Sequence, residues 1–122
     1  MCNRIVVRLT KEYFLKHSSD FDNVFKHNCV KVKHHCFLML VVKNTQVIPR
    51  LGLAIAKKHT KKAVQRNYLK RIIRESFRHH IPQLANVDIV VLAIRSSSND
   101  SNKQLWKSIN QAWQLLLEKL SC

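Results

Sequence analysis

The sequence has little glycine, proline or acid. Its 122 residues include one Gly, two Pro and seven Asp or Glu. One glycine excludes a glycine-rich phosphate loop, and no G-x-x-x-x-G-K-[ST] motif occurs. Metal-dependent phosphodiester hydrolysis needs several converging carboxylates, whereas the seven acids are scattered along the chain. Two histidines around one phosphate stay open as a metal-free alternative, although the pairs 34–35 and 79–80 are expected to diverge. The residues favour binding over catalysis.

Long hydrophobic runs are also absent. The longest, Cys36 to Val42, is too short to span a bilayer. Met1 to Thr10 lacks the plan of a signal peptide, so we expect a cytoplasmic protein with no membrane partner. The four cysteines form no C-x-x-C pair and are expected to be free thiols. Possible zinc ligands occur between residues 27 and 36, but their spacing matches no known finger, and we predict no metal site.

Positive charge is abundant and concentrated. The formal net charge is +15, and residues 57–80 hold nine Lys or Arg against one acid, Glu75. Four lysines (57, 58, 61 and 62) crowd the expected start of a helix, where the macrodipole would favour acids. Exposed N–H groups, the dipole and these lysines together suit phosphate oxygens. The block predicts a nucleic-acid partner.

The same block has helical periodicity. With Thr60 as N-cap, a 100° advance per residue separates two faces. The expected core stripe contains Leu69, Ile72, Ile73, Ser76 and His80, with Phe77 at its edge. The other face is polar or cationic and contains Asn67, Lys70, Arg71, Arg74 and Arg78. Pro82 is expected to move Ile81 out of the helical region and end the helix.

The remaining elements predict one α+β domain over residues 15–122, with residues 1–14 as an N-terminal extension. We expect a helix capped by Ser18 or Ser19, strands at 31–34, 36–43, 51–56 and 87–94, and a last helix with a Ser101/Gln104 capping box. The strand–helix–strand order around the basic helix predicts a crossover between parallel neighbours. In strand 51–56 one face is small: Gly52, Ala54 and Ala56.

The block from Lys57 to Arg78, with Arg66-Asn67, Lys70-Arg71 and Arg74-Glu75 inside it, resembles the signature of the bacterial ribonuclease P protein subunit. The resemblance extends to residues 18–25, 50–53 and 88–93 and to the last helix. It implies a sandwich of about four strands and three helices with a left-handed crossover, against the usual handedness.

The resemblance also implies a function. The family's holoenzyme is an endoribonuclease that removes 5′ leaders from precursor tRNA. Its partner RNA and magnesium ions held mainly by that RNA perform the chemistry, and no obligatory protein partner is implied. Residues matching the catalytic-RNA contacts are Lys57, Lys58, Lys61, Lys62, Arg66, Asn67, Lys70, Arg71, Arg74 and Arg78. Residues matching the leader cleft are Phe21, Phe25, Gly52, Ala54 and Ala56. The motif's second arginine is Tyr68 here, a departure that puts one RNA contact in doubt.

Without the resemblance, the sequence favours Phe21 and Phe25 as core residues over a role in lining a groove where bases stack. Two other classes also fit the charge: a ribosomal or other structural RNA-binding protein, and a self-sufficient nuclease. Cleavage of precursor tRNA by the protein alone would identify the last, and failure to stimulate the catalytic RNA would favour the first.

Overall fold

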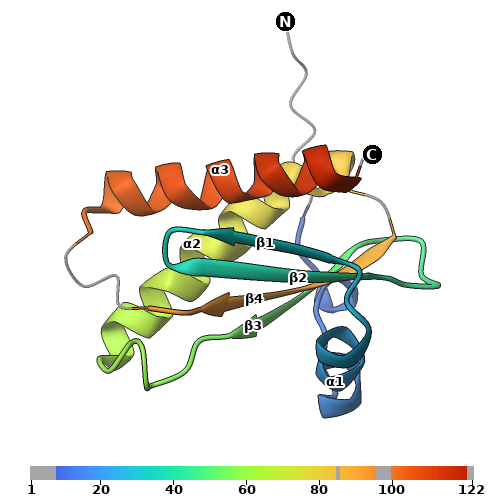
Figure 1. Ribbon diagram of the computed structural model, residues 1–122, viewed down its shortest axis with the longest axis horizontal. Coiled ribbons are helices and arrows are strands. Elements are labelled where there is room, and N and C mark those ends of the chain that lie inside the picture. Colours follow the sequence, from blue (N-terminus) through green and yellow to red (C-terminus); the bar gives the residue numbers. More distant parts are fainter. Residues whose placement is uncertain (1–7, 85, 96–99, 121–122) are drawn as a thin grey trace, which may run out of the picture.

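The computed structural model describes residues 8–84, 86–95 and 100–120. Three helices and a four-stranded sheet form the domain (Figure 1). The helices are α1 (Ser18–His27), α2 (Ala63–His80) and α3 (Asn102–Leu120), with short 3-10 turns η1 (Lys11–Tyr13) and η2 (Ile81–Gln83). The strands are β1 (Val30–His34), β2 (Phe37–Lys43), β3 (Arg50–Ala54) and β4 (Val87–Ala93). The predicted α+β class and strand number are confirmed.

The strand order is β1-β2-β4-β3. β2 pairs antiparallel with β1 and with β4, whereas β3 pairs parallel with β4. The chain passes from β3 through α2 to β4, so the predicted crossover between parallel neighbours is present. Its handedness stays a prediction. β3 lies at an edge of the sheet, and residues before α1 approach it: Phe14 forms an isolated bridge with Leu51, and the Leu15 N–H donates to the Leu51 carbonyl at 3.0 Å.

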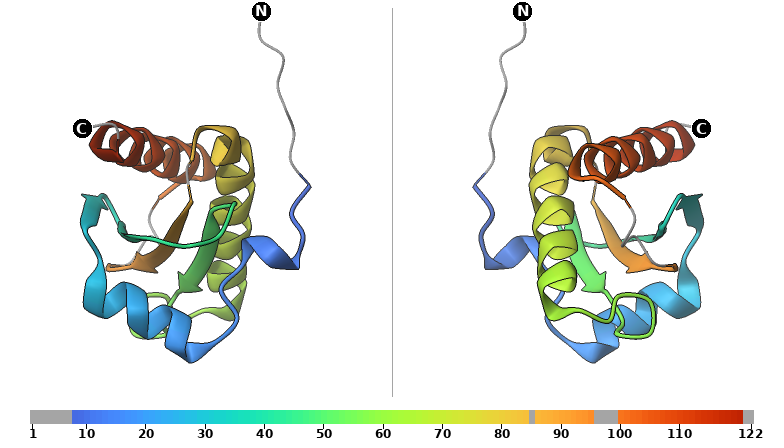
Figure 2. Two further views of the ribbon diagram at one scale, coloured as in Figure 1. Left: turned by 90° about the vertical axis from the view of Figure 1, so that its right-hand side faces the viewer. Right: turned by 90° about the vertical axis from the view of Figure 1, so that its left-hand side faces the viewer.

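The sheet is covered on both faces, α2 and α3 on one and α1 on the other (Figures 1 and 2). The larger core joins alternate strand residues, including Met39, Leu51 and Ile89, to the two long helices. The smaller core joins Leu40 and Val90 to α1 and Leu15. Period-two alternation in the strands separates these two sets of side chains.

The buried face of α2 is the one that the sequence predicts. Its buried residues are the predicted ones: Leu69, Ile72, Ile73, Ser76, Phe77 and His80. Inside the core, the Trp113 Nε1–H donates to Ser76 Oγ at 2.8 Å, and His80 stacks on the same indole with ring centroids 5.9 Å apart. Ser76 and His80 are therefore core residues with polar partners.

Both ends of α2 differ from the prediction. The helix begins at Ala63, with Lys62 rather than Thr60 at the N-cap. Residues 57–59 form a turn in which the N–H groups of His59 and Thr60 both approach the Ala56 carbonyl, and this turn delays the helix. At the other end Ile81 stays in the helical region (φ −52°, ψ −45°), because it begins the 3-10 turn η2, in whose first turn Pro82 needs to donate no N–H.

The start of α1 also differs from the prediction, whereas the start of α3 confirms it. His17, not Ser18 or Ser19, is the N-cap of α1, and its N–H donates to Asp20 Oδ2 at 3.4 Å. The α3 capping box is present: Ser101 N–H donates to Gln104 Oε1 at 2.8 Å, and Gln104 N–H donates to Ser101 Oγ at 3.2 Å. Of the cysteines, Cys29 and Cys36 are free as predicted, and Cys2 and Cys122 lie outside the described residues.

Candidate nucleic-acid interface

The cationic face of α2 comprises Asn67, Lys70, Arg71, Arg74 and Arg78. Arg71 and Arg74 are exposed and Lys70 is partly buried. These three side chains form no ion pair or hydrogen bond with any described residue, while Arg78 donates to Glu75 at 2.9 Å. Like charges three and four residues apart repel, so the unbound face carries a repulsion that an anionic ligand would relieve.

Residues 57–62, the lysine loop, lead into this helix. Lys57, Lys58, Lys61 and Lys62 are all exposed. The predicted RNA contact Arg66 is directed back at this loop, where its Nη1 donates to the carbonyls of Thr60 at 2.9 Å and Lys61 at 2.8 Å. The N-cap has no side-chain hydrogen bond to the first turn. Arg66 thus orders a lysine-rich loop beside helix N–H groups that suit an anion.

A cavity of about 570 Å³, the β3 cavity, lies along the edge strand. Its lining includes predicted residues of both kinds: Lys70 and Arg74 from α2, Phe21 from α1 and Gly52 from β3. The full lining is Leu9, Phe14, Leu15, Phe21, Leu51, Gly52, Leu53, Lys70 and Arg74. Apolar side chains and two cations in one lining suit single-stranded nucleic acid, whose bases stack on apolar faces while its phosphates contact cations.

Gly52 leaves space for the aromatic ring of Phe21. A Cβ on Gly52 would lie 2.7 Å from Cε1 and 2.8 Å from Cζ of Phe21, and 2.9 Å from Cδ1 of Leu15. The backbone at Gly52 does not have positive φ, so its small size, rather than its conformational freedom, is what this site needs. The predicted small-residue face is therefore real at this position.

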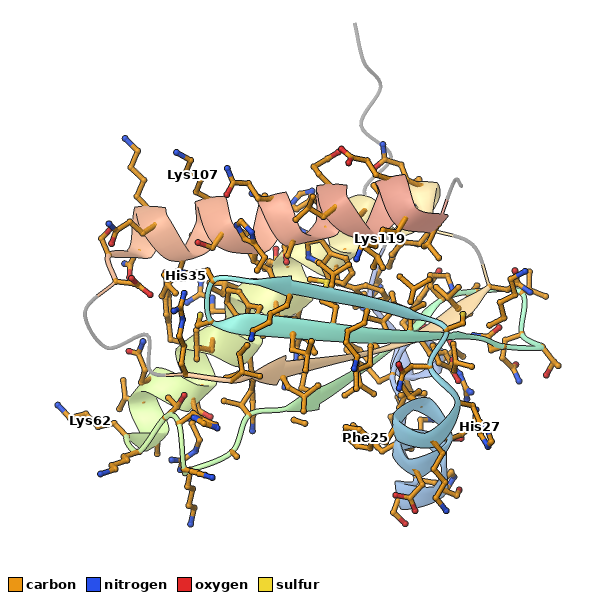
Figure 3. The ribbon with its side chains drawn as sticks, viewed as in Figure 1. Phe25, His27, His35, Lys62, Lys107 and Lys119 are labelled. Atoms are coloured by element: carbon orange, nitrogen blue, oxygen red, sulfur yellow. The ribbon has the colours of Figure 1, made fainter. Side chains whose placement is uncertain are left out.

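The other predicted leader residues lie outside the β3 cavity. Phe25 is 42% exposed and projects from α1 below the sheet, on the side where Lys62 lies (Figure 3). Ala54 packs with the smaller core beneath α1. Ala56 is exposed and follows the end of β3, which stops at Ala54 rather than continuing to residue 56.

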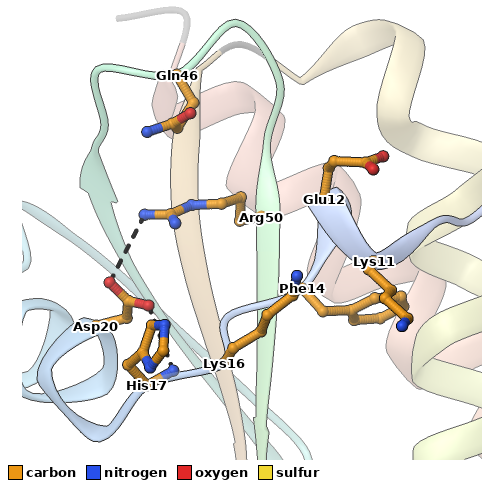
Figure 4. Close-up of a pocket in the computed structure, with 8 residues that line it drawn as sticks. All are labelled: Lys11, Glu12, Phe14, Lys16, His17, Asp20, Gln46 and Arg50. Carbon is orange, nitrogen blue, oxygen red and sulfur yellow. Dashed lines mark hydrogen bonds and ion pairs between the residues drawn. The ribbon is translucent and has the colours of Figure 1, made fainter.

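The sequence did not predict that residues 9–17 line cavities at this surface. Leu9, Phe14 and Leu15 line the β3 cavity. A second cavity of about 270 Å³ beside the start of α1 is lined by Lys11, Glu12, Phe14, Lys16, His17, Asp20, Gln46 and Arg50 (Figure 4). The apolar cluster 13–15 just before the helix was the available sign in the sequence, but it has no period that would have fixed its place.

Arg50 anchors the end of β3 through a buried carboxylate. Its Nε and Nη2 donate to the two oxygens of Asp88 at 2.8 and 2.7 Å, and Asn44 Nδ2 donates to the same group at 2.7 Å. Asp88 is 2% exposed. The hydrogen bond to Asp88 raises the pKa of Arg50 above its ordinary value. Arg50 Nη2 also lies 4.0 Å from Asp20 (Figure 4), which connects the strand to α1.

Among the described residues, one group could bring three metal-ligand atoms together: His35, Cys36 and Asp100, within 4.8 Å of one another. His35 Nε2 lies 2.7 Å from Asp100 Oδ2, and Arg95 Nη2 donates to His35 Nδ1 at 3.3 Å. With Nδ1 accepting, Nε2 carries the proton toward Asp100, which makes the pair a hydrogen bond rather than a ligand set. Burial raises the pKa of the Cys36 thiol to about 11, and Asp100 adds to the shift.

The same group does not fit magnesium. Mg²⁺ prefers oxygen ligands in near-octahedral geometry, and this group offers one carboxylate. We therefore assign no catalytic step to a magnesium ion held by the described residues. No described helix is long and apolar enough to cross a membrane.

A small, strongly basic α+β domain whose cationic helix borders a cavity at a sheet edge defines an RNA-binding protein by class. Comparison with known proteins narrows the class. The family model for Ribonuclease P matches residues 9–117. The ribonuclease P protein component of Pseudomonas aeruginosa is 45% identical over 97 residues, 80% of this chain and 72% of that protein. The component from a Marinomonas strain is 39% identical over 105 residues, 86% of this chain and 80% of that one.

Solved structures of ribonuclease P proteins have a similar fold. The ribonuclease P protein of Staphylococcus aureus superposes with a TM-score of 0.77 at 28% identity, over 85% of this chain and 94% of that chain. The Thermotoga maritima protein gives 0.69 at 30% identity, over 86% and 94%. The chain belongs to the ribonuclease P protein family. It is a subunit of the ribonucleoprotein endonuclease of tRNA processing, and the ribosomal and self-sufficient nuclease alternatives are not supported.

Proposed function

We propose that this subunit binds the catalytic RNA of ribonuclease P through the cationic face of α2 and the lysine loop, and the single-stranded 5′ leader of precursor tRNA along the β3 cavity. In this proposal the RNA holds the magnesium ions and cleaves the phosphodiester bond. The protein positions the substrate and supports leader removal at low magnesium concentration.

The observation that carries the proposal is the composition of the β3 cavity. Phe21 and Gly52 line it together with Lys70 and Arg74. One strand of leader can therefore contact apolar and cationic groups at once, while exposed Arg71 on the same helix stays available to a second RNA.

Reconstitution tests the proposal. The protein alone should not cut precursor tRNA. Added to a bacterial ribonuclease P RNA at low magnesium, it should restore cleavage and favour substrates whose leaders are several nucleotides long over those with one nucleotide. Cleavage by protein alone, or no stimulation of the RNA, would contradict the proposal.

Two variants separate the surfaces. Lys62→Ala/Arg71→Ala removes two exposed cations that do not line the β3 cavity, and each lost phosphate contact should reduce the slope of log affinity against log salt by about 0.7–0.9. Phe21→Ala should reduce the preference for long leaders with little change in that slope, because stacking is not ionic. The matched control, Lys33→Ala/Lys43→Ala, removes two exposed lysines from β1 and β2 and should leave the slope and the leader preference unchanged.

A further inference from the structure

Between α2 and α3 lies a separate cavity of about 520 Å³, the α2–α3 pocket. It is lined by Tyr68, Arg71, Ile72 and Glu75 from α2 and by Trp106 from α3. This volume lies within the range of about 300–1,000 Å³ of small-ligand sites. The pocket shares only Arg71 with the cationic face and no residue with the β3 cavity.

The lining combines two aromatic rings with opposite charges. Tyr68 and Trp106 are both partly buried and pack against the rim of the main core, and Ile72 is buried below them. Arg71 is exposed and has no partner among the described residues, whereas Glu75 is paired with Arg78. Aromatic faces offer stacking, the guanidinium offers a contact to phosphate, and the carboxylate accepts N–H groups of a base.

We propose that the α2–α3 pocket takes one unpaired nucleobase of the catalytic RNA, stacked on Tyr68 or Trp106, with an adjacent phosphate on Arg71. The inference rests on the proposed function, since the occupant belongs to the RNA bound by the cationic face. The positive charge of α2 favours this occupant. Arg71 lies beside Lys70 and Arg74 on the cationic face, and these three side chains attract a polyanion.

The two tryptophans provide a direct test. Trp113 is fully buried, with its indole N–H bonded to Ser76, and RNA cannot reach it without unfolding. Titration of the full chain with a bacterial ribonuclease P RNA should therefore quench the fluorescence of Trp106 selectively. The quenching should disappear in Trp106→Phe, which keeps a ring for stacking, and remain in Trp113→Phe, with circular dichroism to establish that each variant is folded.

Salt dependence distinguishes stacking from charge. Loss of one stacked base should weaken RNA binding by roughly 5- to 150-fold in Tyr68→Ala and in Trp106→Leu, by the same factor at every salt concentration. Tyr68→Phe should bind as the wild type, and Arg71→Ala should instead flatten the salt slope. Leu115→Ala, at an exposed site elsewhere on α3, should change neither quantity.

The inference is overturned if the wild type binds and stimulates the RNA without quenching of Trp106. It is equally overturned if Tyr68→Ala and Trp106→Leu bind as tightly as the wild type, or if Tyr68→Ala alters only the salt slope. In each case the wild-type titration shows RNA binding, so the proposed function stands. Failure of the proposed function would appear as no stimulation by the wild type.

Discussion

Gly52→Ala tests the steric relation between β3 and α1. The added methyl group would meet the ring of Phe21 at 2.7 and 2.8 Å and Leu15 Cδ1 at 2.9 Å. All three contact atoms belong to side chains, and the Phe21 ring is only partly buried. The ring therefore has to move away from Gly52, and the β3 cavity that it lines is the space beside it.

The expected loss of stability is small. Overpacking costs about 1–3 kcal/mol, and replacing glycine by alanine within a strand returns about 0.5–1 kcal/mol. A flexible, partly exposed ring places the cost at the low end, near about 1 kcal/mol, which leaves a net loss of at most about 0.5 kcal/mol in the free energy of unfolding. Urea unfolding followed by circular dichroism measures this difference.

The functional loss should exceed the loss of stability. With the Phe21 ring displaced, the reconstituted enzyme should lose much of its preference for long leaders while keeping its affinity for the catalytic RNA, because α2 is unchanged. A competitive cleavage assay with substrates of two leader lengths measures the preference.

A double variant tests the steric explanation. Phe21→Leu removes the two ring atoms nearest to the new methyl group, so Gly52→Ala should cost less stability in that background, with a residual cost from Leu15. An equal cost in both backgrounds would show that the Phe21 contact is not the cause. A wild-type leader preference in Gly52→Ala would refute the functional step.

Three further predictions concern stability. Arg50→Met leaves the Asp88 carboxylate buried without its cation and should lower the free energy of unfolding by about 3–5 kcal/mol, measured in urea, with Arg50→Lys less affected. Because the native pKa of the Cys36 thiol is raised to about 11 from about 9.0, its unfolded form loses the proton first. Stability should therefore fall between about pH 9 and pH 11 by at most about 2–3 kcal/mol more in the wild type than in Cys36→Ala. Ser76→Ala leaves the Trp113 N–H without its 2.8 Å partner and should cost about 1–3 kcal/mol, in contrast to exposed Ser101→Ala, which should affect only the local cap.

The buried face of α2 could be predicted because helical geometry relates sequence spacing to direction. Leu69, Ile72, Ile73 and Ser76 fall on one face at 100° per residue whatever they pack against. The Ser101/Gln104 capping box was equally local, since its two hydrogen bonds span three residues. These two features depend only on neighbours in the chain, and both were predicted correctly.

The ends of helices were less predictable because they depend on competing partners. Thr60 has the right chemistry for an N-cap, but the turn at residues 57–59 and the two hydrogen bonds from Arg66 place the start of α2 at Ala63. His17 caps α1 through its backbone N–H, which any residue except proline can supply. These choices are decided by contacts that propensity alone does not include.

By itself, the sequence determined the charge of the molecule, the two faces of its basic helix, and the small residue at position 52. The tertiary structure decided which of these features meet. It placed Gly52 and Phe21 in one cavity lining with Lys70 and Arg74, and it put Tyr68 and Trp106 in the lining of another. The physical reason is that a cavity is a property of packing between segments distant in sequence, and no local periodicity specifies which segments become neighbours.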